Sequence, residues 1–445
     1  MAFPEMNRRH FMKHLAGLSA LAIPGMQFVQ RLRAAEPILK KEGKSLIVLW
    51  MGGGPSHMDL WDLKPGEATG GEFKPMKTAV SGIEISELLP TVAAEFKNLS
   101  IIRSLSSGEA DHMRGTQVMN TGRTPSVIVP YPSIGSVVSS LVTPKELPLP
   151  GFIGVGGTAQ RIGPGFLGMT YAPFTVQNPG QPPQNIKAPN GLGATEEEQM
   201  ARMRRRQRLF YEVEDSFTEK LFPGVKEEER KESGDAADAH GTVYKKAFDL
   251  SVSPLRTVFE VRNEDKKTLD MYGGERNTFG MGCLLARKLV EKGVSCVEVD
   301  LGGWDNHANI FNTLKGTANN MGLAGRLDKG MGALVKDLVD RGRWKDTVIV
   351  WMGDFGRTPK INQNAGRDHW ARCWSVVVGG GGIKGGQVYG ATSKDGMDIA
   401  ENKVSVGDLF ATLYKGLGLD PETKVRDNLS RPISIAEGKP IAALV

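Results

Sequence analysis

This 445-residue chain has seven histidines, and the four that lie outside the N-terminal leader and the charged middle segment are each within two positions of an aspartate. Imidazole nitrogen and carboxylate oxygen together suit zinc, manganese or iron, and a carboxylate can also orient a ligating imidazole from behind. The pairing therefore predicts a metal site or an acid/base site, although Asp and His are both common in loops and a single pair can arise by chance. The four pairs are His57 with Asp59, His112 with Asp111, His307 with Asp305, and His369 with Asp368.

Apolar runs that end at glycines precede several of these pairs. Residues 44–51 run into three glycines, residues 295–301 precede Gly-Gly-Trp-Asp, and residues 347–352 precede Gly-Asp-Phe-Gly. A fourth run, residues 375–378, enters another glycine-rich stretch. Such runs are typical of buried parallel strands that feed functional loops. We therefore expect the chemistry at the carboxyl ends of these strands.

Helical patterns alternate with the strands. Apolar residues at three- and four-residue spacing predict helices over residues 279–292 and 327–341. Strand, loop and helix in repetition predict a three-layer α/β/α sandwich with a mostly parallel sheet, formed as one domain by residues 44–445.

The middle of the chain differs in composition. It begins with a stretch rich in Pro, Gln and Asn and continues with two runs of charge. We expect residues 178–240 to form a charged, partly flexible insertion or arm, with an exposed helix near 195–221. The arginines of that helix either contact an anionic partner or simply face solvent.

The N-terminus predicts export. Residues 7–13 read Asn-Arg-Arg-His-Phe-Met-Lys and precede a modest apolar stretch, which resembles a twin-arginine signal over residues 1–35 and implies a periplasmic or secreted protein. The alternative is a basic leader that stays in the cytoplasm. The leader holds five basic residues and one acid, so the formal charge of +6 falls to +2 without it, which gives no support to nucleic-acid binding. No later window is apolar enough for an integral membrane span.

Several motifs carry a family resemblance. Residues 111–123 read Asp-His-Met-Arg-Gly-Thr-Gln-Val-Met-Asn-Thr-Gly-Arg and resemble the nucleophile motif of sulfatases, in which Cys or Ser precedes Pro-Ser-Arg and a helix that closes with Leu-Thr-Gly-Arg. Residues 353–359 read Gly-Asp-Phe-Gly-Arg-Thr-Pro, and residues 366–370 read Gly-Arg-Asp-His-Trp. As a set these motifs resemble the domain of unknown function 1501 family, within the alkaline-phosphatase-like superfamily, over nearly all of residues 44–445.

The resemblance implies an alkaline-phosphatase-like fold with one or two divalent metal ions, such as zinc, calcium or manganese, beside an attacking nucleophile. Two departures stand out: Phe355 follows Asp354 where His is usual, and one residue separates Asp305 from His307 where three are usual. The metal ligands carried over by motif are His57, Asp59, Asp305, His307, Asp354 and His369.

His112 occupies the slot of the catalytic Cys, Ser or Thr. A histidine there can attack, transfer protons or bind a metal, and the sequence leaves all three open. Arg114 and Arg123 would steady a tetrahedral anion, or would form structural ion pairs. The resemblance implies an exported metal-dependent hydrolase of sulfate or phosphate esters, with a small anionic ester or a sulfated or phosphorylated saccharide as substrate. The alternative is a noncatalytic exported protein that binds a metal or ligand on a degenerate hydrolase fold.

Overall fold

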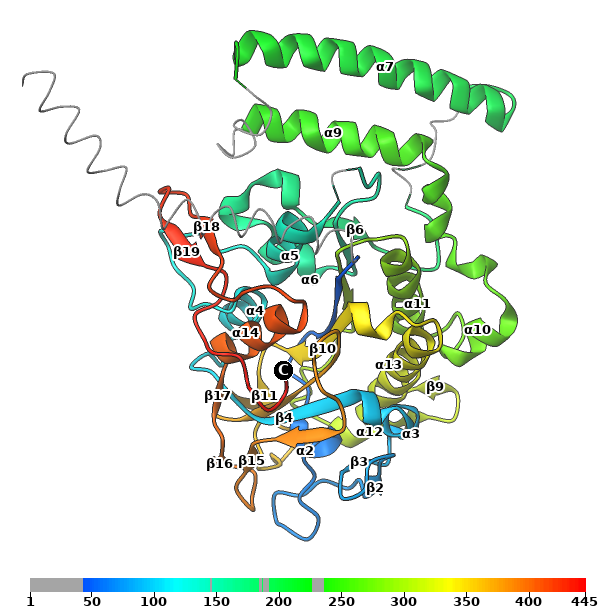
Figure 1. Cartoon of the computed structure of the whole chain (residues 1–445). Helices are drawn as coiled ribbons and strands as arrows, with labels where there is room; N and C mark the ends of the chain where they lie inside the picture. Colours follow the sequence, from blue (N-terminus) through cyan, green and yellow to red (C-terminus); the bar gives the residue numbers. More distant parts are fainter. Residues whose placement is uncertain (1–42, 145, 184–185, 187–191, 226–235) are drawn as a thin grey trace, which may run out of the picture.

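A nine-stranded, mostly parallel sheet is the centre of the molecule in the computed structural model, which describes residues 43–144, 146–183, 186, 192–225 and 236–445 (Figure 1). The twin-arginine signal expected over residues 1–35 lies outside the described residues. Only β13 runs antiparallel to its neighbours in this sheet. The strand order is β14 (Gln387–Tyr389), β4 (Leu99–Ser106), β13 (Trp374–Gly380), β10 (Thr347–Gly353), β1 (Ser45–Met51), β7 (Cys296–Asp300), β5 (Phe152–Val155) and β6 (Phe174–Val176), with β17 (Val404–Ser405) paired to β4.

The sequence of β1 explains why both faces of the sheet are covered. All of its residues are buried, with Ile47 and Leu49 in one hydrophobic core and Val48 and Trp50 in the other. Because successive side chains of a strand point to opposite faces, a continuous apolar run needs packing partners on both sides.

Helices supply those partners (Figure 1). The helices α11 (Thr278–Glu291) and α13 (Leu323–Asp340) confirm the two helices predicted from apolar spacing, and the helices on both faces of the sheet confirm the predicted three-layer α/β/α sandwich. No helix of the described chain has the length and apolarity needed to cross a bilayer. The core of Ile47 and Leu49 takes in α3 (Pro90–Ala94), α11 (Thr278–Glu291) and α13 (Leu323–Asp340), and the core of Val48 and Trp50 takes in α4 (His112–Thr121), α5 (Ile134–Val142) and α14 (Val406–Gly416).

Shorter elements connect these layers. The short helices are α2 (His57–Leu60), α6 (Thr158–Ile162), α10 (Lys266–Met271) and α12 (Ile310–Lys315). The small two-stranded sheets are β2 (Pro75–Lys77) with β3 (Glu84–Ser86), β8 (Gly316–Thr317) with β9 (Asn320–Met321), β11 (Gly356–Arg357) with β12 (His369–Trp370), β15 (Ala391–Thr392) with β16 (Ile399–Glu401), and β18 (Lys424–Arg426) with β19 (Pro432–Ser434).

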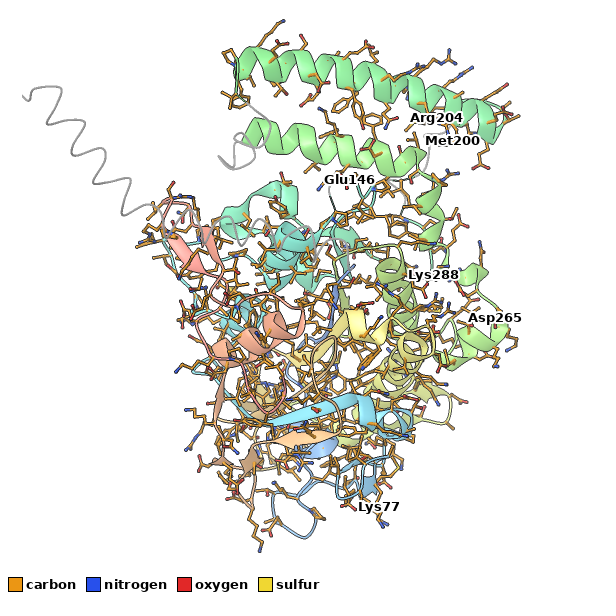
Figure 2. The ribbon with its side chains drawn as sticks, viewed as in Figure 1. Lys77, Glu146, Met200, Arg204, Asp265 and Lys288 are labelled. Carbon is orange, nitrogen blue, oxygen red and sulfur yellow. The ribbon has the colours of Figure 1, made fainter. Side chains whose placement is uncertain are left out.

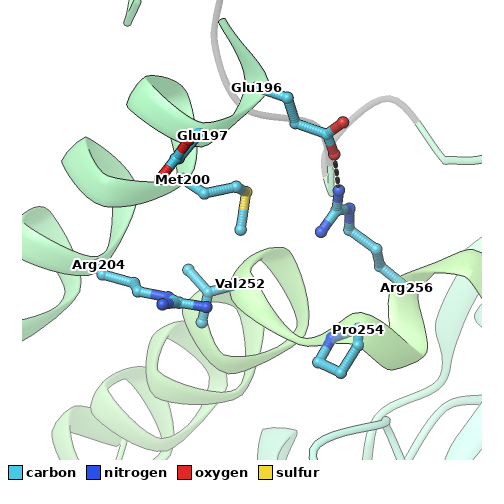
Figure 3. A pocket seen from close by; sticks show the side chains of 7 residues that line it. All are labelled: Glu196, Glu197, Met200, Arg204, Val252, Pro254 and Arg256. Carbon is cyan, nitrogen blue, oxygen red and sulfur yellow. Dashed lines mark hydrogen bonds and ion pairs between the residues drawn. The ribbon is translucent and has the colours of Figure 1, made fainter.

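Two long helices stand apart from the sandwich as an arm. Figure 1 shows α7 (Glu196–Leu221) as the outermost element, with α9 (Ala236–Val252) between it and the body. The exposed helix predicted near 195–221 is α7, but the described arm continues past residue 240 to the end of α9. Where the arm joins the body, the Glu196 carboxylate pairs with Arg256 beside a pocket of about 380 Å³ (Figure 3).

The centre of the sheet holds one buried carboxyl group. Glu298 lies on β7, between Val48 of β1 and Gly154 of β5, and is buried. Burial raises its pKa from 4.5 to about 8, with a smaller contribution from the neighbouring Asp300.

The Glu298→Gln variant tests this assignment. Between pH 4.5 and about 8 the folded chain retains a proton that the unfolded chain has lost, so the stability of the wild type falls as the pH rises and the loss is complete above pH 8. The glutamine of the variant does not titrate, so the variant lacks this pH-dependent loss of stability. We expect its free energy of unfolding to gain on the wild type from pH 5 to pH 9, by roughly 1.4 kcal/mol per unit of pKa shift. Urea denaturation at several pH values measures the difference, and a difference independent of pH would contradict the assignment.

Candidate metal site

Loops from four strands meet at one edge of the sheet. His112, Asp305 and Asp354 follow β4, β7 and β10, which are parallel, so all three lie at the carboxyl edge. His369 lies in the short strand β12, which precedes β13 of the main sheet. Because β13 runs in the opposite direction, the residues before it reach the same edge.

Three imidazole nitrogens surround one oxygen of Asp305. Its Oδ1 lies 2.9 Å from Nε2 of His307, 3.2 Å from Nε2 of His112 and 3.4 Å from Nε2 of His369. The Nε2 atoms of His307 and His369 are 3.1 Å apart. Donor atoms of His112, Asp305 and His369 all lie within 4.8 Å of one another. These side chains form a compact nitrogen and oxygen donor set of the kind that binds a divalent cation.

The other nitrogen of each ring faces an acceptor. The Nδ1 atom of His112 lies 2.5 Å from Oδ2 of Asp354, that of His307 lies 2.8 Å from Oδ1 of Asp368, and that of His369 lies 2.8 Å from the carbonyl oxygen of Ala110. An acceptor at Nδ1 selects the tautomer whose Nε2 lone pair faces the centre of the cluster. Two lone pairs 3.1 Å apart repel each other unless a proton or a cation lies between them. The residues present therefore fit a metal ion.

Arg357 fixes the position of Asp305. Its guanidinium is buried, with Nη2 2.5 Å from Oδ1 of Asp305 and Nε donating to the carbonyl of Gly54 at 2.8 Å. Partial burial raises the pKa of Asp305, but the hydrogen bond and charge of Arg357 outweigh this effect and hold the pKa well below its usual range. Sequence reasoning gave Arg357 no role at the site. The only signal was its place three residues after Asp354.

Phe355 occupies the position after Asp354, where the motif resemblance led us to expect histidine. Its ring is buried and stacks on His112, with centroids 4.8 Å apart, and lies 4.7 Å from the ring of His369. The aromatic side chain therefore restricts two imidazoles by packing and offers no ligand of its own. The Asp354 hydrogen bond raises the pKa of His112, against the opposing effect of burial.

Two glycines allow the loops to close on one another. A Cβ atom at Gly115 would lie 2.9 Å from the Phe355 ring and 3.0 Å from the carbonyl oxygen of Asp354, so only glycine lets α4 approach closely enough for His112 to reach Asp354. A Cβ atom at Gly366 would lie 2.1 Å from the carbonyl carbon of His307. The loops that carry His307 and His369 therefore touch through backbone.

Of the ligands expected by motif, the structure brings Asp305, His307, Asp354 and His369 together with His112, but not His57 and Asp59. Asp59 is buried and receives hydrogen bonds from Arg367, Nε at 2.8 Å and Nη2 at 3.1 Å, and from the hydroxyl of Ser56 at 2.5 Å. Neither ring nitrogen of His57 has a hydrogen-bond partner among the described atoms, and burial lowers its pKa to about 4. Both side chains are buried, and neither is a ligand of the cluster.

The two arginines expected to steady an anion also lie elsewhere. Arg114 projects from α4 and binds Glu109 through Nε at 2.7 Å and Nη2 at 2.6 Å. Arg123 is buried, and its guanidinium is bound by Glu437 and by the carbonyl of Ser434. Both arginines therefore form structural ion pairs, as the alternative interpretation of the motif predicted, because their guanidinium groups are bound by glutamate side chains of the chain itself.

A cavity of about 840 Å³ opens beside the cluster. Its volume is typical of sites for small organic molecules. The Thr158 hydroxyl donates to Asp300 at 2.9 Å, and both residues line the cavity. The lining comes from the carboxyl ends of β1 and β7, from α4 and from α6: Trp50, Gly52, Gly53, His112, Met113, Thr116, Thr158, Ile162, Asp300, Gly302, Gly303, Asp305 and Asp354.

Two arginine variants compare the stability contributed by a buried ion pair with that contributed by an exposed one. Arg367→Met leaves the Asp59 carboxylate buried without its guanidinium, so we expect the free energy of unfolding to fall by about 3–5 kcal/mol. Arg114→Ala removes an exposed ion pair and should cost less than about 1 kcal/mol. Urea denaturation compares the two variants. Equal stability would show that the Asp59–Arg367 pair does not hold the core as described.

The chain is similar to several solved structures at low identity and matches one family model. Similar solved structures include a protein of the alkaline phosphatase superfamily from Vibrio parahaemolyticus (12% identity, 85% of this chain and 67% of that chain, TM-score 0.34) and the sulfatase PsFucS1 from Pseudoalteromonas sp. (13%, 88% and 71%, TM-score 0.38). Another is the alkaline phosphatase of the Antarctic bacterium TAB5 (13%, 79% and 95%, TM-score 0.30). No curated protein matches the sequence. The family described as Protein of unknown function (DUF1501) matches residues 43–445, and the chain belongs to that family.

Proposed function

We propose that this protein is an exported, metal-dependent hydrolase of sulfate or phosphate esters. The observation that carries the proposal is the meeting of three Nε2 atoms at Asp305 Oδ1, with each Nδ1 held by an acceptor, at the edge of an organic-sized cavity. Export rests on the twin-arginine motif of residues 7–13.

The residues that would hold the metal are His112, Asp305 and His369, and Nε2 of His307 lies 2.9 Å from Oδ1 of Asp305 and 3.1 Å from Nε2 of His369. A divalent ion bound there supplies Lewis acidity, which polarises an ester oxygen and lowers the pKa of a bound water. A donor set of imidazole nitrogen and carboxylate oxygen favours zinc or manganese over calcium, which prefers a site built from oxygen atoms alone.

The chain's own side chains orient this centre. Asp354, Asp368 and the Ala110 carbonyl set the imidazole tautomers, while Arg357 keeps Asp305 ionised and in place. The sequence leaves His112 open as a nucleophile, a proton-transferring group or a metal ligand. Both of its nitrogens are directed at carboxylates of the cluster, so the geometry favours a ligand role for this residue.

The cavity supports a saccharide or other polyol as the organic part of the ester. The exposed Met113 offers an apolar side chain, while Thr116 and Asp300 offer hydroxyl and carboxylate groups that match sugar hydroxyls. The anionic sulfate or phosphate would lie at the His112 end of the cavity, because the metal charge is there.

Metal content and ester hydrolysis of the purified chain test the proposal together. We expect the wild type to retain divalent metal after dialysis and to hydrolyse 4-nitrophenyl sulfate or 4-nitrophenyl phosphate. Asp305→Asn and His369→Ala should lose both metal and activity, because each removes a donor from the cluster. The matched control is Arg114→Ala, which removes a charge from α4, the helix of His112, at a position outside the cavity lining. This variant should keep both the metal and the activity. Bound metal without hydrolysis of any sulfate or phosphate ester would favour the noncatalytic alternative.

The carboxylates behind the imidazoles give a finer test. Asp354→Asn leaves every proposed ligand in place but weakens the acceptor at Nδ1 of His112. We expect metal affinity to fall by roughly 10- to 100-fold, measured by competition with a chelator. Asp368→Asn should act in the same direction through His307. Unchanged affinity in both variants would show that these hydrogen bonds do not support a metal centre.

A further inference from the structure

Two carboxyl groups lie on one face of β7. Glu298 and Asp300 are two positions apart in this strand, so their Cβ atoms point to the same face of the sheet, roughly 7 Å from each other. Glu298 is buried at the centre of the sheet, whereas Asp300 is half-buried and lines the cavity beside the cluster around Asp305. The two groups therefore lead from the interior of the sheet to the wall of the cavity.

Glycines of the neighbouring strand make room for these carboxyl groups. Gly154 of β5 is the register partner of Glu298, and a Cβ atom at Gly156, just beyond β5, would lie 2.5 Å from Cβ of Asp300. A larger residue at position 156 would therefore displace Asp300. On its other side Asp300 accepts a hydrogen bond from the Thr158 hydroxyl at 2.9 Å, which holds its carboxylate at the cavity wall.

No structural contact explains why Glu298 is buried. Side chains crowd both faces of the sheet (Figure 2), and the other buried carboxyl groups there hold neighbours in place. Asp59 is bound by Arg367, and Asp328 accepts hydrogen bonds from two backbone amides of α3. In contrast, Oε1 of Glu298 has no hydrogen-bond partner among the described atoms. An unpaired buried carboxyl group lowers stability, and beside a cavity it is a candidate for a functional group.

The two carboxyl groups influence each other's protonation. Burial is the main cause of the raised pKa of Glu298, and the charge of Asp300 adds to it. The strands β1 and β5 and the helix α5 place only apolar, glycine or hydroxyl side chains around the pair. The thiol of Cys296, on the same face of β7, stays neutral because burial raises its pKa, and His112 faces the same cavity from α4. Near neutral pH the pair therefore holds one proton.

We propose that Glu298 and Asp300 share one proton and together form the general acid that protonates the leaving oxygen of the ester. Asp300 is the group that touches the ester, and Glu298 is a positioning residue that acts through Asp300. This assignment rests on the proposed hydrolase function. An oxygen that attacks from the cluster around Asp305 makes the leaving oxygen depart away from that cluster, because displacement at phosphorus or sulfur is in line. The leaving oxygen then enters the cavity that Asp300 also lines.

The proton transfer balances the reaction. The bond between the sulfur or phosphorus and the ester oxygen breaks, and its electron pair stays on that oxygen. The carboxyl proton of Asp300 passes to the same oxygen, which leaves as an alcohol. The attacking water gives its oxygen and one proton to the sulfate or phosphate, and its second proton restores the carboxyl pair. Glu298 lies behind Asp300 and holds the shared proton between turnovers.

Leaving groups of different basicity test the acid. The 4-nitrophenolate ion leaves without a proton, whereas an alkoxide needs one as it departs. With a 4-nitrophenyl ester we expect Asp300→Asn to stay within about tenfold of the wild-type rate, and with the benzyl ester of the same acid to fall by roughly 10²- to 10⁴-fold. The matched control is Asp270→Asn, which removes an exposed carboxylate of α10 outside the cavity lining and should keep both rates.

The outcomes separate the acid from the hydrolase function itself. A wild type that hydrolyses neither ester overturns both proposals. If the wild type hydrolyses both esters and Asp300→Asn affects the two rates equally, only the acid is overturned. The metal content of Asp300→Asn should match that of the wild type, and a loss of metal would place Asp300 in the metal site instead.

The pH–rate profile tests Glu298. With the benzyl ester, kcat should fall at alkaline pH as the pair loses its shared proton. We expect Glu298→Gln to move this fall to lower pH, because Asp300 then holds the proton alone and without a neighbouring carboxyl group. The profile with the 4-nitrophenyl ester should not move. An unchanged profile with the benzyl ester would overturn the role of Glu298.

Stability measurements test the shared proton without any substrate. Asp300→Asn removes the charge that contributes to the raised pKa of Glu298, so the pH-dependent loss of stability due to Glu298 should end at a lower pH than in the wild type. Urea denaturation at several pH values isolates this loss when the wild type is compared with Glu298→Gln, and Asp300→Asn with Asp300→Asn/Glu298→Gln. The same pH dependence in both comparisons would show that the two carboxyl groups do not interact, which overturns the proposal.

Discussion

The convergence of imidazole nitrogens on one carboxylate oxygen is the constraint around which this edge of the molecule is arranged. His112, His307 and His369 come from different loops, yet each presents Nε2 to Asp305. Such an arrangement is repulsive without a proton or cation at its centre. The surrounding structure offsets that cost by fixing every ring from behind with an acceptor and by placing the Arg357 guanidinium on Asp305.

Strand direction brings these side chains to the same place. Three of the loops leave parallel strands, and the fourth enters β13, which runs the other way. A side chain that precedes an antiparallel strand therefore meets side chains that follow parallel ones. Glycine at positions 115 and 366 then removes the Cβ atoms that would hold the loops apart.

Burial distinguishes the proposed metal ligands from aspartates that form structural ion pairs. The Asp59 carboxylate is enclosed and taken up by Arg367, so it stabilises the core instead of facing a ligand. Asp305 is half exposed, although it too is bound to an arginine. The difference lies in access to the cavity, which Asp305 lines and Asp59 does not.

Family membership and fold were within reach of the sequence because they depend on patterns that are local. Continuous apolar runs predicted β1, β7 and β10 closely, and three- and four-residue spacing predicted α11 and α13. The motifs also indicated which loops meet at the cluster, since residues at the carboxyl ends of parallel strands share one edge of a sheet.

The sequence by itself determined the residue types, the strands and the family, while the tertiary structure decided which charged groups face one another. His57 with Asp59 has the same local pattern as His307 with Asp305, yet only the second pair joins the cluster. Arg114 and Arg123 matched an anion-binding motif but are bound by Glu109 and Glu437. Partners as distant in sequence as Asp59 and Arg367 are chosen by the packing of whole elements, and no pattern confined to one segment of the chain records that choice.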